Sequence, residues 1–123
     1  MRKFLLLLFG LLSVFTVFAR NTDEALGVLQ RVSRQSSIPI SLELKKDGSN
    51  MYYEYSVVNG VLRLKGSDNV ALCRGFYDYV KAHKLGMYSW SGNNIQLPSS
   101  LPATNDVKVV SPFQNHYYFN VSK

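Results

Sequence analysis

The amino-acid sequence predicts an α+β fold, in which a small antiparallel or mixed sheet carries two helices packed on one face. Two stretches show the apolar period of a helix, and five short stretches show strand character. Their order is helix, three strands, helix, two strands. The 123-residue chain is 46% hydrophobic, which suits one domain with a packed core and rules out a large multidomain enzyme.

Residues 1–19 are predicted to be a secretory signal peptide. A basic dipeptide precedes an apolar run over residues 4–18, and Ala19 suits cleavage by a signal peptidase. We therefore expect an exported protein that is periplasmic, cell-surface or secreted, or lysosomal in a eukaryote. It would have no membrane contact after cleavage. An uncleaved anchor that retains residues 4–19 is the alternative.

The first helix follows this segment. Asn21 and Glu24 have the spacing of a capping box, and the helix should end near Gln35. One apolar face is predicted from residues at helical spacing, which are Ala25, Val28, Leu29 and Val32.

Three strands come next, over residues 40–44, 51–58 and 61–64, and we expect them to pair antiparallel in chain order. The dipeptide Asn59-Gly60 supplies the positive φ angles of a tight type I′ hairpin between the last two. This hairpin is the strongest local prediction in the sequence.

The second of these strands is rich in tyrosine. Tyr53 and Tyr55 alternate in step with Val57, so they should enter the core and leave Tyr52 beside Glu54 on the polar side. Flat rings also bind sugars and bases by stacking, which makes sugar or base binding by this strand the competing interpretation.

A second helix is predicted over residues 70–85, with Ser67-Asp68-Asn69 as its caps and Gly86 as its left-handed stop. A second hairpin should follow, with strands over residues 87–90 and 95–97. The stretch beyond it contains three prolines and is predicted to be a connector.

No catalytic or metal site, and no cofactor, is predicted from the residues. Glu43 and Glu54 lie on the polar sides of their strands and are expected to be solvent-facing charges. Cys73, the single cysteine, lies on an apolar helix face and should act as a small hydrophobe. It cannot form an intramolecular disulfide, and with His83 and His116 it lacks any zinc spacing.

Nucleic acid is excluded as a partner by the charge. The formal net charge is +6, and it falls to +4 when the two basic residues of the signal peptide are removed. That charge is too small and too scattered for a nucleic-acid footprint.

The second half of the sequence resembles the amino-terminal domain of the alpha-N-acetylglucosaminidases, which are lysosomal and bacterial glycoside hydrolases. About sixty residues carry the resemblance, in a fixed order of short motifs. They are Gly66-Ser67, Gly75 with Phe76-Tyr77, Trp90-Ser91-Gly92, Gln96-Leu97-Pro98, Leu101-Pro102 and Tyr117-Tyr118-Phe119-Asn120.

The resemblance implies that residues 20–112 form an accessory α+β domain and that residues 113–123 begin a linker into a (β/α)-barrel. The family's two catalytic glutamates lie in that barrel and have no counterpart here, so this chain alone would not be an enzyme. It also implies that the barrel is the main partner, that a glycan is a further candidate partner, and that Asn120 contacts the sugar.

Two residues of the resemblance have expected structural roles. Gly75 should let another element approach the helix closely, at a cost in helix propensity of about 1 kcal/mol. Trp90 should bury its ring under the second hairpin. We also expect marginal stability and a sticky apolar surface over residues 113–119. The alternative function is a free-standing secreted carbohydrate-binding or interaction module, which would be a stable monomer.

Overall fold

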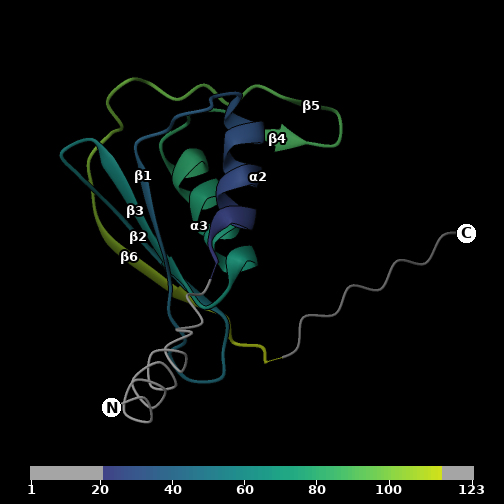
Figure 1. The fold of residues 1–123 in the computed structure, drawn as a ribbon, viewed down its shortest axis with the longest axis vertical. Coiled ribbons are helices and arrows are strands. Elements are labelled where there is room, and N and C mark those ends of the chain that lie inside the picture. Colours follow the sequence, from purple (N-terminus) through teal and green to yellow (C-terminus); the bar gives the residue numbers. More distant parts are fainter. Residues whose placement is uncertain (1–20, 115–123) are drawn as a thin grey trace, which may run out of the picture.

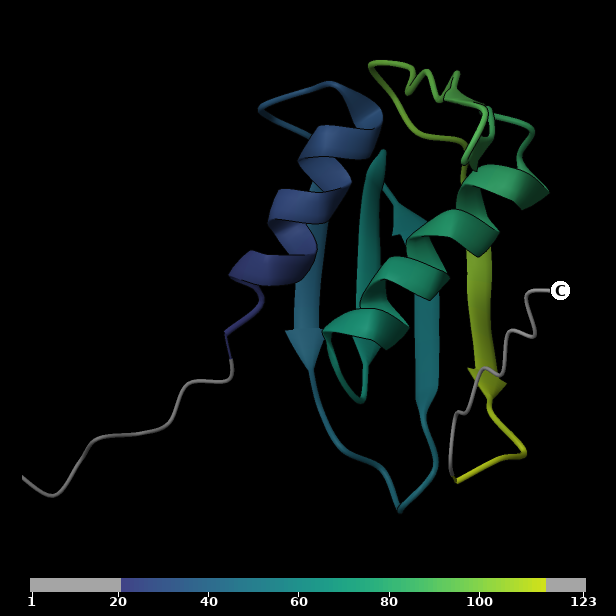
Figure 2. The ribbon, with the colours of Figure 1, turned by 90° about the vertical axis from the view of Figure 1, so that its right-hand side faces the viewer.

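The structure, a computed structural model, describes residues 21–114 and has two helices on one face of a four-stranded sheet (Figure 1). Figure 2 shows both helices crossing the same face of the sheet. The elements, in chain order, are α2 (Asp23–Ser33), β1 (Ile40–Leu44), β2 (Tyr52–Val58), β3 (Val61–Gly66), α3 (Asn69–Ala82), β4 (Tyr88–Ser89), β5 (Gly92–Asn93) and β6 (Thr104–Val110). The predicted fold class is confirmed.

Parts of the predicted organisation lie outside the described residues. These are the signal peptide over residues 1–19 and all but the first two residues of the linker over residues 113–123. Among residues 21–114, neither helix has the length and apolar character needed to span a bilayer.

The strand order of the sheet is β1-β3-β2-β6, and β1 runs parallel to β3. The expectation of three antiparallel strands in chain order is therefore wrong for β1, which pairs Ile40 with Leu62 and Leu44 with Gly66. The tight hairpin already joins β2 to β3, and the longer connection over residues 45–51 carries the chain past the end of β3. Alternation shows which side chains face the core, but it does not show which strand is the neighbour.

The hairpin between β2 and β3 is confirmed. Asn59 and Gly60 have φ angles of 55° and 75°, and the strands pair antiparallel from Val58 and Val61 onward. Positive φ at both central residues gives the turn the twist that the two strands need.

The sequence prediction missed β6, which pairs antiparallel with β2 and forms the other edge of the sheet. It was expected to be part of a proline-rich connector. Pro102 and Pro112 instead lie just beyond its two ends, so no proline interrupts the ladder. The second hairpin is also shorter than predicted, because residues 95–97 form no strand and contribute Ile95 and Leu97 to the core.

The hydrophobic core lies between the helices and the sheet. It contains Tyr53, Tyr55 and Val57, as their alternation predicted. The close approach at Gly75 is also confirmed, because a β-carbon there would lie 3.0 Å from Cδ2 of Leu64 and 3.0 Å from Cδ2 of Tyr53. Helix α3 therefore packs against β2 and β3 at a distance that only glycine allows without adjustment.

The two helix starts are capped differently. The carboxylate of Asp68 accepts a hydrogen bond of 2.7 Å from the Ala71 N–H, which confirms the predicted cap of α3. At α2 the N-cap is Thr22, one residue later than the predicted capping box has it, and its side chain makes no capping hydrogen bond; the Asn21 side chain instead accepts from the Asp23 N–H at 2.8 Å. In a capping box the Glu24 carboxylate would accept from the backbone N–H of the capping residue. Here it accepts a hydrogen bond of 3.4 Å from the side chain of Asn69.

Helix α3 ends at Ala82, three residues before the predicted end. The left-handed residue after it is Lys84, with a φ of 54°. Gly86 has a φ of 136°, and a β-carbon there would lie 2.5 Å from the Cα of Ile95. Gly86 is thus required by the close packing of the chain after β5 and is not the stop of the helix.

Candidate docking surface

An apolar groove runs over the outer side of the helix layer, between α2, α3 and the chain around β4. We call it the helix groove. Its volume is about 340 Å³, and its only charged lining residue is Arg74. The lining residues are Val28, Leu29, Val32, Val70, Cys73, Arg74, Phe76, Tyr77, Tyr88 and Ile95. Such a lining binds apolar side chains much better than sugar hydroxyls.

A second apolar groove, the edge groove, lies between α3 and the β6 edge of the sheet and has a volume of about 560 Å³. Val70 and Arg74 line both grooves, so the two flank the first half of α3. Val70 is 67% exposed and Phe113 is 65% exposed. The lining residues are Met51, Tyr52, Tyr53, Val70, Arg74, Val109, Ser111, Pro112 and Phe113.

The β4–β5 hairpin lies beside α2 (Figure 1), and its exposed side chains extend the apolar surface next to the helix groove. Met87 and Tyr88 are more than half exposed, and the side chain of Trp90 is 100% exposed. The expectation that Trp90 is buried under the hairpin is therefore wrong. Strands β4 and β5 have only two residues each, and Trp90 occupies the turn between them, where no second layer formed by residues 21–114 covers it.

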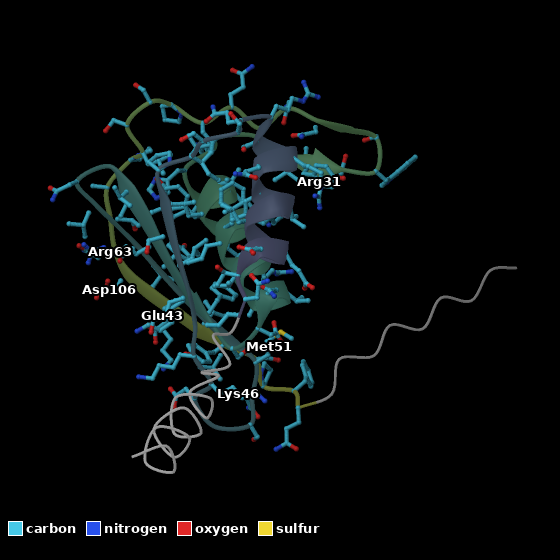
Figure 3. The ribbon with its side chains drawn as sticks, in the orientation of Figure 1. Arg31, Glu43, Lys46, Met51, Arg63 and Asp106 are labelled. Carbon is cyan, nitrogen blue, oxygen red and sulfur yellow. The ribbon has the colours of Figure 1, made fainter. Side chains whose placement is uncertain are left out.

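The helix-free face of the sheet is charged. Figure 3 shows Glu43, Arg63 and Asp106 on this side, away from the helices. Lys65 lies opposite Glu43 on one side and Glu54 on the other. Glu54 in turn contacts the ammonium of Lys65 at 3.8 Å. Both glutamates line a hollow of about 360 Å³ on this face together with Arg63, Lys65 and Lys108. Glu43 is exposed and Glu54 is half-buried, so the predicted role as a solvent-facing charge agrees with the position of Glu43 and only partly with that of Glu54.

Lys108 joins this face to the connection between β1 and β2. Its ammonium lies 2.9 Å from Asp47 and 3.3 Å from Glu54. The hydrogen bonds to both carboxylates raise the pKa of Lys108, and the bond to Lys108 lowers the pKa of Asp47. Each exposed ion pair of this kind contributes little to the stability of the fold, but together they make this face polar and hydrated.

Tyr52 is buried on the same face, with only 2% of its surface exposed. The expectation that it stands on the polar side is correct for its direction but wrong for its environment. Its hydroxyl donates a hydrogen bond of 2.6 Å to the Lys45 carbonyl, and the Lys108 ammonium lies 4.9 Å from its ring centroid. Burial raises the pKa of Tyr52. Its ring is thus covered and not open to stacking by a sugar or a base.

Cys73 and His83, the thiol and the imidazole within residues 21–114, are not brought together. Cys73 is half-buried in the helix groove, and burial raises the pKa of its thiol. His83 is the C-cap of α3 and lies about 15 Å from Cys73 along the helix axis. Its ring centroid is 4.6 Å from that of Tyr79. Within residues 21–114 no group of three potential metal ligands occurs. His116 and Asn120 lie outside the described residues.

Sequence reasoning missed several residues of this surface, above all Val70, Tyr88 and Val109. The sequence places Val70 in a helix, Tyr88 in a strand and Val109 in a connector, and it indicates no binding role for any of them. A signal was present for Val70, because it directly follows the capping residues and falls outside the arc of the helix that faces the core. Phe113, the first residue of the predicted sticky stretch, is exposed as expected.

The sequence profile of the Alpha-N-acetylglucosaminidase (NAGLU) N-terminal domain matches residues 23–103. No curated protein is significantly similar to the sequence. Among solved structures, the fold is similar to part of a family 89 glycoside hydrolase from Clostridium perfringens. Its complex with PUGNAc matches with a TM-score of 0.67 and 23% identity, over 75% of this chain. Its complex with 2-acetamido-1,2-dideoxynojirmycin matches with a TM-score of 0.70 and 22% identity, over 81%.

The match covers only a small part of the solved enzyme, 11% of its chain in the first complex and 12% in the second. A third structure of the C. perfringens protein, a double variant with its substrate GlcNAc-alpha-1,4-galactose, matches with the same TM-score and identity as the first. At this identity the structural likeness concerns the fold.

Proposed function

Because the chain belongs to the alpha-N-acetylglucosaminidase N-terminal domain family, we propose that it is a non-catalytic accessory domain of an exported glycoside hydrolase. In this role it packs against the catalytic domain and orders the segment that enters it. The similar solved enzyme is about eight to nine times as long as the matched region, which leaves room for a separate catalytic domain in such a protein.

The observation that carries the proposal is the contrast between the two faces of the domain. Two apolar grooves flank α3 on the helix side, while paired charges cover the helix-free face of the sheet. The apolar side chains of Val70, Tyr88 and Phe113 are exposed to solvent, which is unfavourable for a free-standing domain. Packing against a neighbouring domain would bury them. The docking side is therefore the helix side.

The substrate proposed for the intact protein follows from the same family. The C. perfringens relative was solved with its substrate GlcNAc-alpha-1,4-galactose. We expect the intact protein to release terminal alpha-linked N-acetylglucosamine by a retaining mechanism, with two carboxylates of the catalytic domain. We assign these carboxylates to the catalytic domain and not to Glu43 and Glu54, which share a hollow of the helix-free face with Arg63, Lys65 and Lys108. Asn120 remains the proposed sugar contact.

A free-standing carbohydrate-binding or interaction module is the second candidate. It is favoured by one observation, the full exposure of Trp90 next to the half-exposed Tyr88. Exposed aromatic side chains of this kind serve both protein and sugar recognition. The two candidates differ in what they predict for the isolated chain, since only the module binds a glycan alone.

The test reads the coding region downstream of Lys123 and assays the longer product for release of N-acetylglucosamine from a chromogenic alpha-linked substrate. The 123-residue chain is assayed beside it, for hydrolysis and for glycan binding. We expect hydrolysis by the longer product only. If no catalytic domain follows, or if the short chain binds glycans by itself, the accessory role is wrong and the module takes its place.

A further inference from the structure

We propose that Trp90 is the anchor residue of the docking surface and inserts its ring into an apolar pocket of the catalytic domain. The inference rests on the proposed function, because it concerns the same interface. Trp90 is fully exposed, and Tyr88 in the adjoining strand lines the helix groove. The turn thus continues the groove outward. Tryptophan is among the residues that most often supply the binding energy of protein interfaces.

The base of the hairpin is fixed to α2. The side-chain amide of Asn93 donates a hydrogen bond of 2.6 Å to the carbonyl of Val32, and the guanidinium of Arg34 donates one of 3.1 Å to the Asn93 carbonyl. Arg34 is the left-handed residue that ends α2. These bonds tie the hairpin to the end of the helix before any partner arrives, which lowers the entropic cost of binding.

The hairpin is also closed internally. The side-chain oxygen of Asn94 accepts a hydrogen bond of 2.6 Å from the Met87 N–H, and the Asn94 N–H donates one of 3.0 Å to the Met87 carbonyl. In the turn, the hydroxyls of Ser89 and Ser91 are 2.8 Å apart. Hydrogen bonds thus fix the backbone before and after Trp90, and the ring projects from a turn of defined conformation.

The chemistry around Trp90 favours a protein partner over a glycan. A sugar site needs free donors and acceptors beside its aromatic platform. The nearest polar groups are engaged within the hairpin, since the hydroxyls of Ser89 and Ser91 contact each other and the side-chain oxygen of Asn94 accepts from the Met87 N–H. Asn93 is engaged at both ends, since its oxygen also accepts from the Ile95 N–H. What remains available is the exposed indole, a largely apolar ring whose single N–H donor one carbonyl of a protein pocket can satisfy.

A lipid surface is disfavoured for a different reason. Residues 86–103 contain no lysine or arginine, so the hairpin and the chain after it carry no cation for lipid phosphates. A neighbouring protein domain with an apolar pocket matches an uncharged tip beside an apolar groove.

The experiment uses Trp90 as its own reporter, because it is the single tryptophan of the 123-residue chain. Both this chain and the longer product are made with 5-fluorotryptophan and studied by fluorine NMR. The Trp90→Phe variant of the longer product identifies the Trp90 resonance by its loss. We expect the resonance to show the full H₂O/D₂O shift of an exposed ring in the short chain and to lose that shift in the longer product.

A second variant tests the energetic role of the ring. In the longer product, Trp90→Ala should separate the unfolding of this domain from that of the catalytic domain, so that one calorimetric transition becomes two. The matched control is Val61→Ala, an exposed apolar side chain on the helix-free side of the sheet, which should leave the transitions coupled. In the short chain Trp90→Ala should leave the melting temperature unchanged.

Three results would overturn the inference. The first is a Trp90 resonance that keeps its solvent shift in a longer product that hydrolyses the substrate, in which case the accessory role survives and the anchor does not. The second is a change of that resonance in the short chain on adding GlcNAc-alpha-1,4-galactose, and the third is a change on adding anionic vesicles. A longer product without hydrolase activity, or a coding region that ends at Lys123, removes the proposed function and the inference together.

Discussion

Gly75 of α3 lies so close to Tyr53 of β2 that a β-carbon at position 75 would stand 3.0 Å from Cδ2 of the tyrosine ring. Glycine within a helix costs about 1 kcal/mol relative to alanine. Here the cost is offset by burial, because Tyr53 and the neighbouring Leu64 pack directly beneath the helix backbone. The domain thus accepts a weaker helix for a tighter contact between helix and sheet.

We expect Gly75→Leu to lower the free energy of unfolding by about 3 kcal/mol through overpacking, and Gly75→Ala by about 1 kcal/mol. The matched control is Gly27→Ala in α2, where the nearest atom to the new β-carbon is the movable end of Arg31 at 3.4 Å. That variant should gain up to about 1 kcal/mol. Urea denaturation of the 123-residue chain measures all three. A gain in stability for Gly75→Ala would show that the contact is loose.

Asp68→Ala should lower the free energy of unfolding by about 1 kcal/mol, because it removes the side-chain acceptor of the Ala71 N–H. The control is Thr22→Ala at the start of α2, where the N-cap side chain makes no capping hydrogen bond. We expect no measurable change there. Equal urea midpoints for the two variants would show that the Asp68 bond contributes nothing.

Tyr79→Phe should cost about 1–2 kcal/mol, because it leaves the Pro102 carbonyl without the hydrogen bond of 2.7 Å that the hydroxyl donates. Tyr79 is fully buried, and this bond ties α3 to the chain that leads into β6. Tyr88→Phe, at an exposed tyrosine, is the control and should be neutral. Thermal unfolding followed by circular dichroism compares them, and identical melting curves would contradict the role of the hydroxyl.

The ion pair of Asp47 and Lys108 predicts a pH dependence. The pKa of Asp47 is lowered from 3.8 by Lys108, so the pair stabilises the fold above that value. Its contribution is lost as the pH falls through the lowered pKa. Asp47→Asn should therefore reduce the urea midpoint slightly at about pH 7 and not at all at about pH 2. A difference that persists in acid would mean that the asparagine acts by another route.

The sequence was sufficient for features that local chemistry determines. Asn59 and Gly60 specify a turn through their φ angles, Asp68 caps a helix through its own carboxylate, and alternation sorts Tyr53 toward the core. Each of these depends on residues within a few positions of one another. They are enough to predict the fold class.

Features that depend on distant partners were not predictable in the same way. Nothing local indicates that β1 pairs with β3, or that β6 completes the sheet beside β2. The burial of Tyr52 depends on Lys45 and Lys108, which approach it from two other segments. Trp90 is exposed because no other element of the described part of the chain covers its turn, whereas residue type alone favours burial for tryptophan.

The docking surface is the hardest part to predict, because it consists of apolar side chains that the rest of the fold leaves exposed. Val70 falls outside the core-facing arc of its helix, and Val109 lies in a stretch that the sequence assigns to a connector, but neither position by itself indicates a groove. Only the arrangement of α3 against β6 shows that they line a groove. Residue patterns report amphipathic character, and the three-dimensional neighbours decide which apolar side chains remain exposed.

The strand order has a consequence for how the chain folds. The β2–β3 hairpin closes through a two-residue turn and can form within microseconds, whereas both edge strands must wait for it. Strand β1 needs β3, which is made after it, and β6 needs β2 across a long intervening segment. We therefore expect a folding nucleus at the central hairpin and α3, with the two edges added late. A chain interrupted before β6 would leave one edge of β2, a strand with three tyrosines, without a partner and open to other unfinished chains.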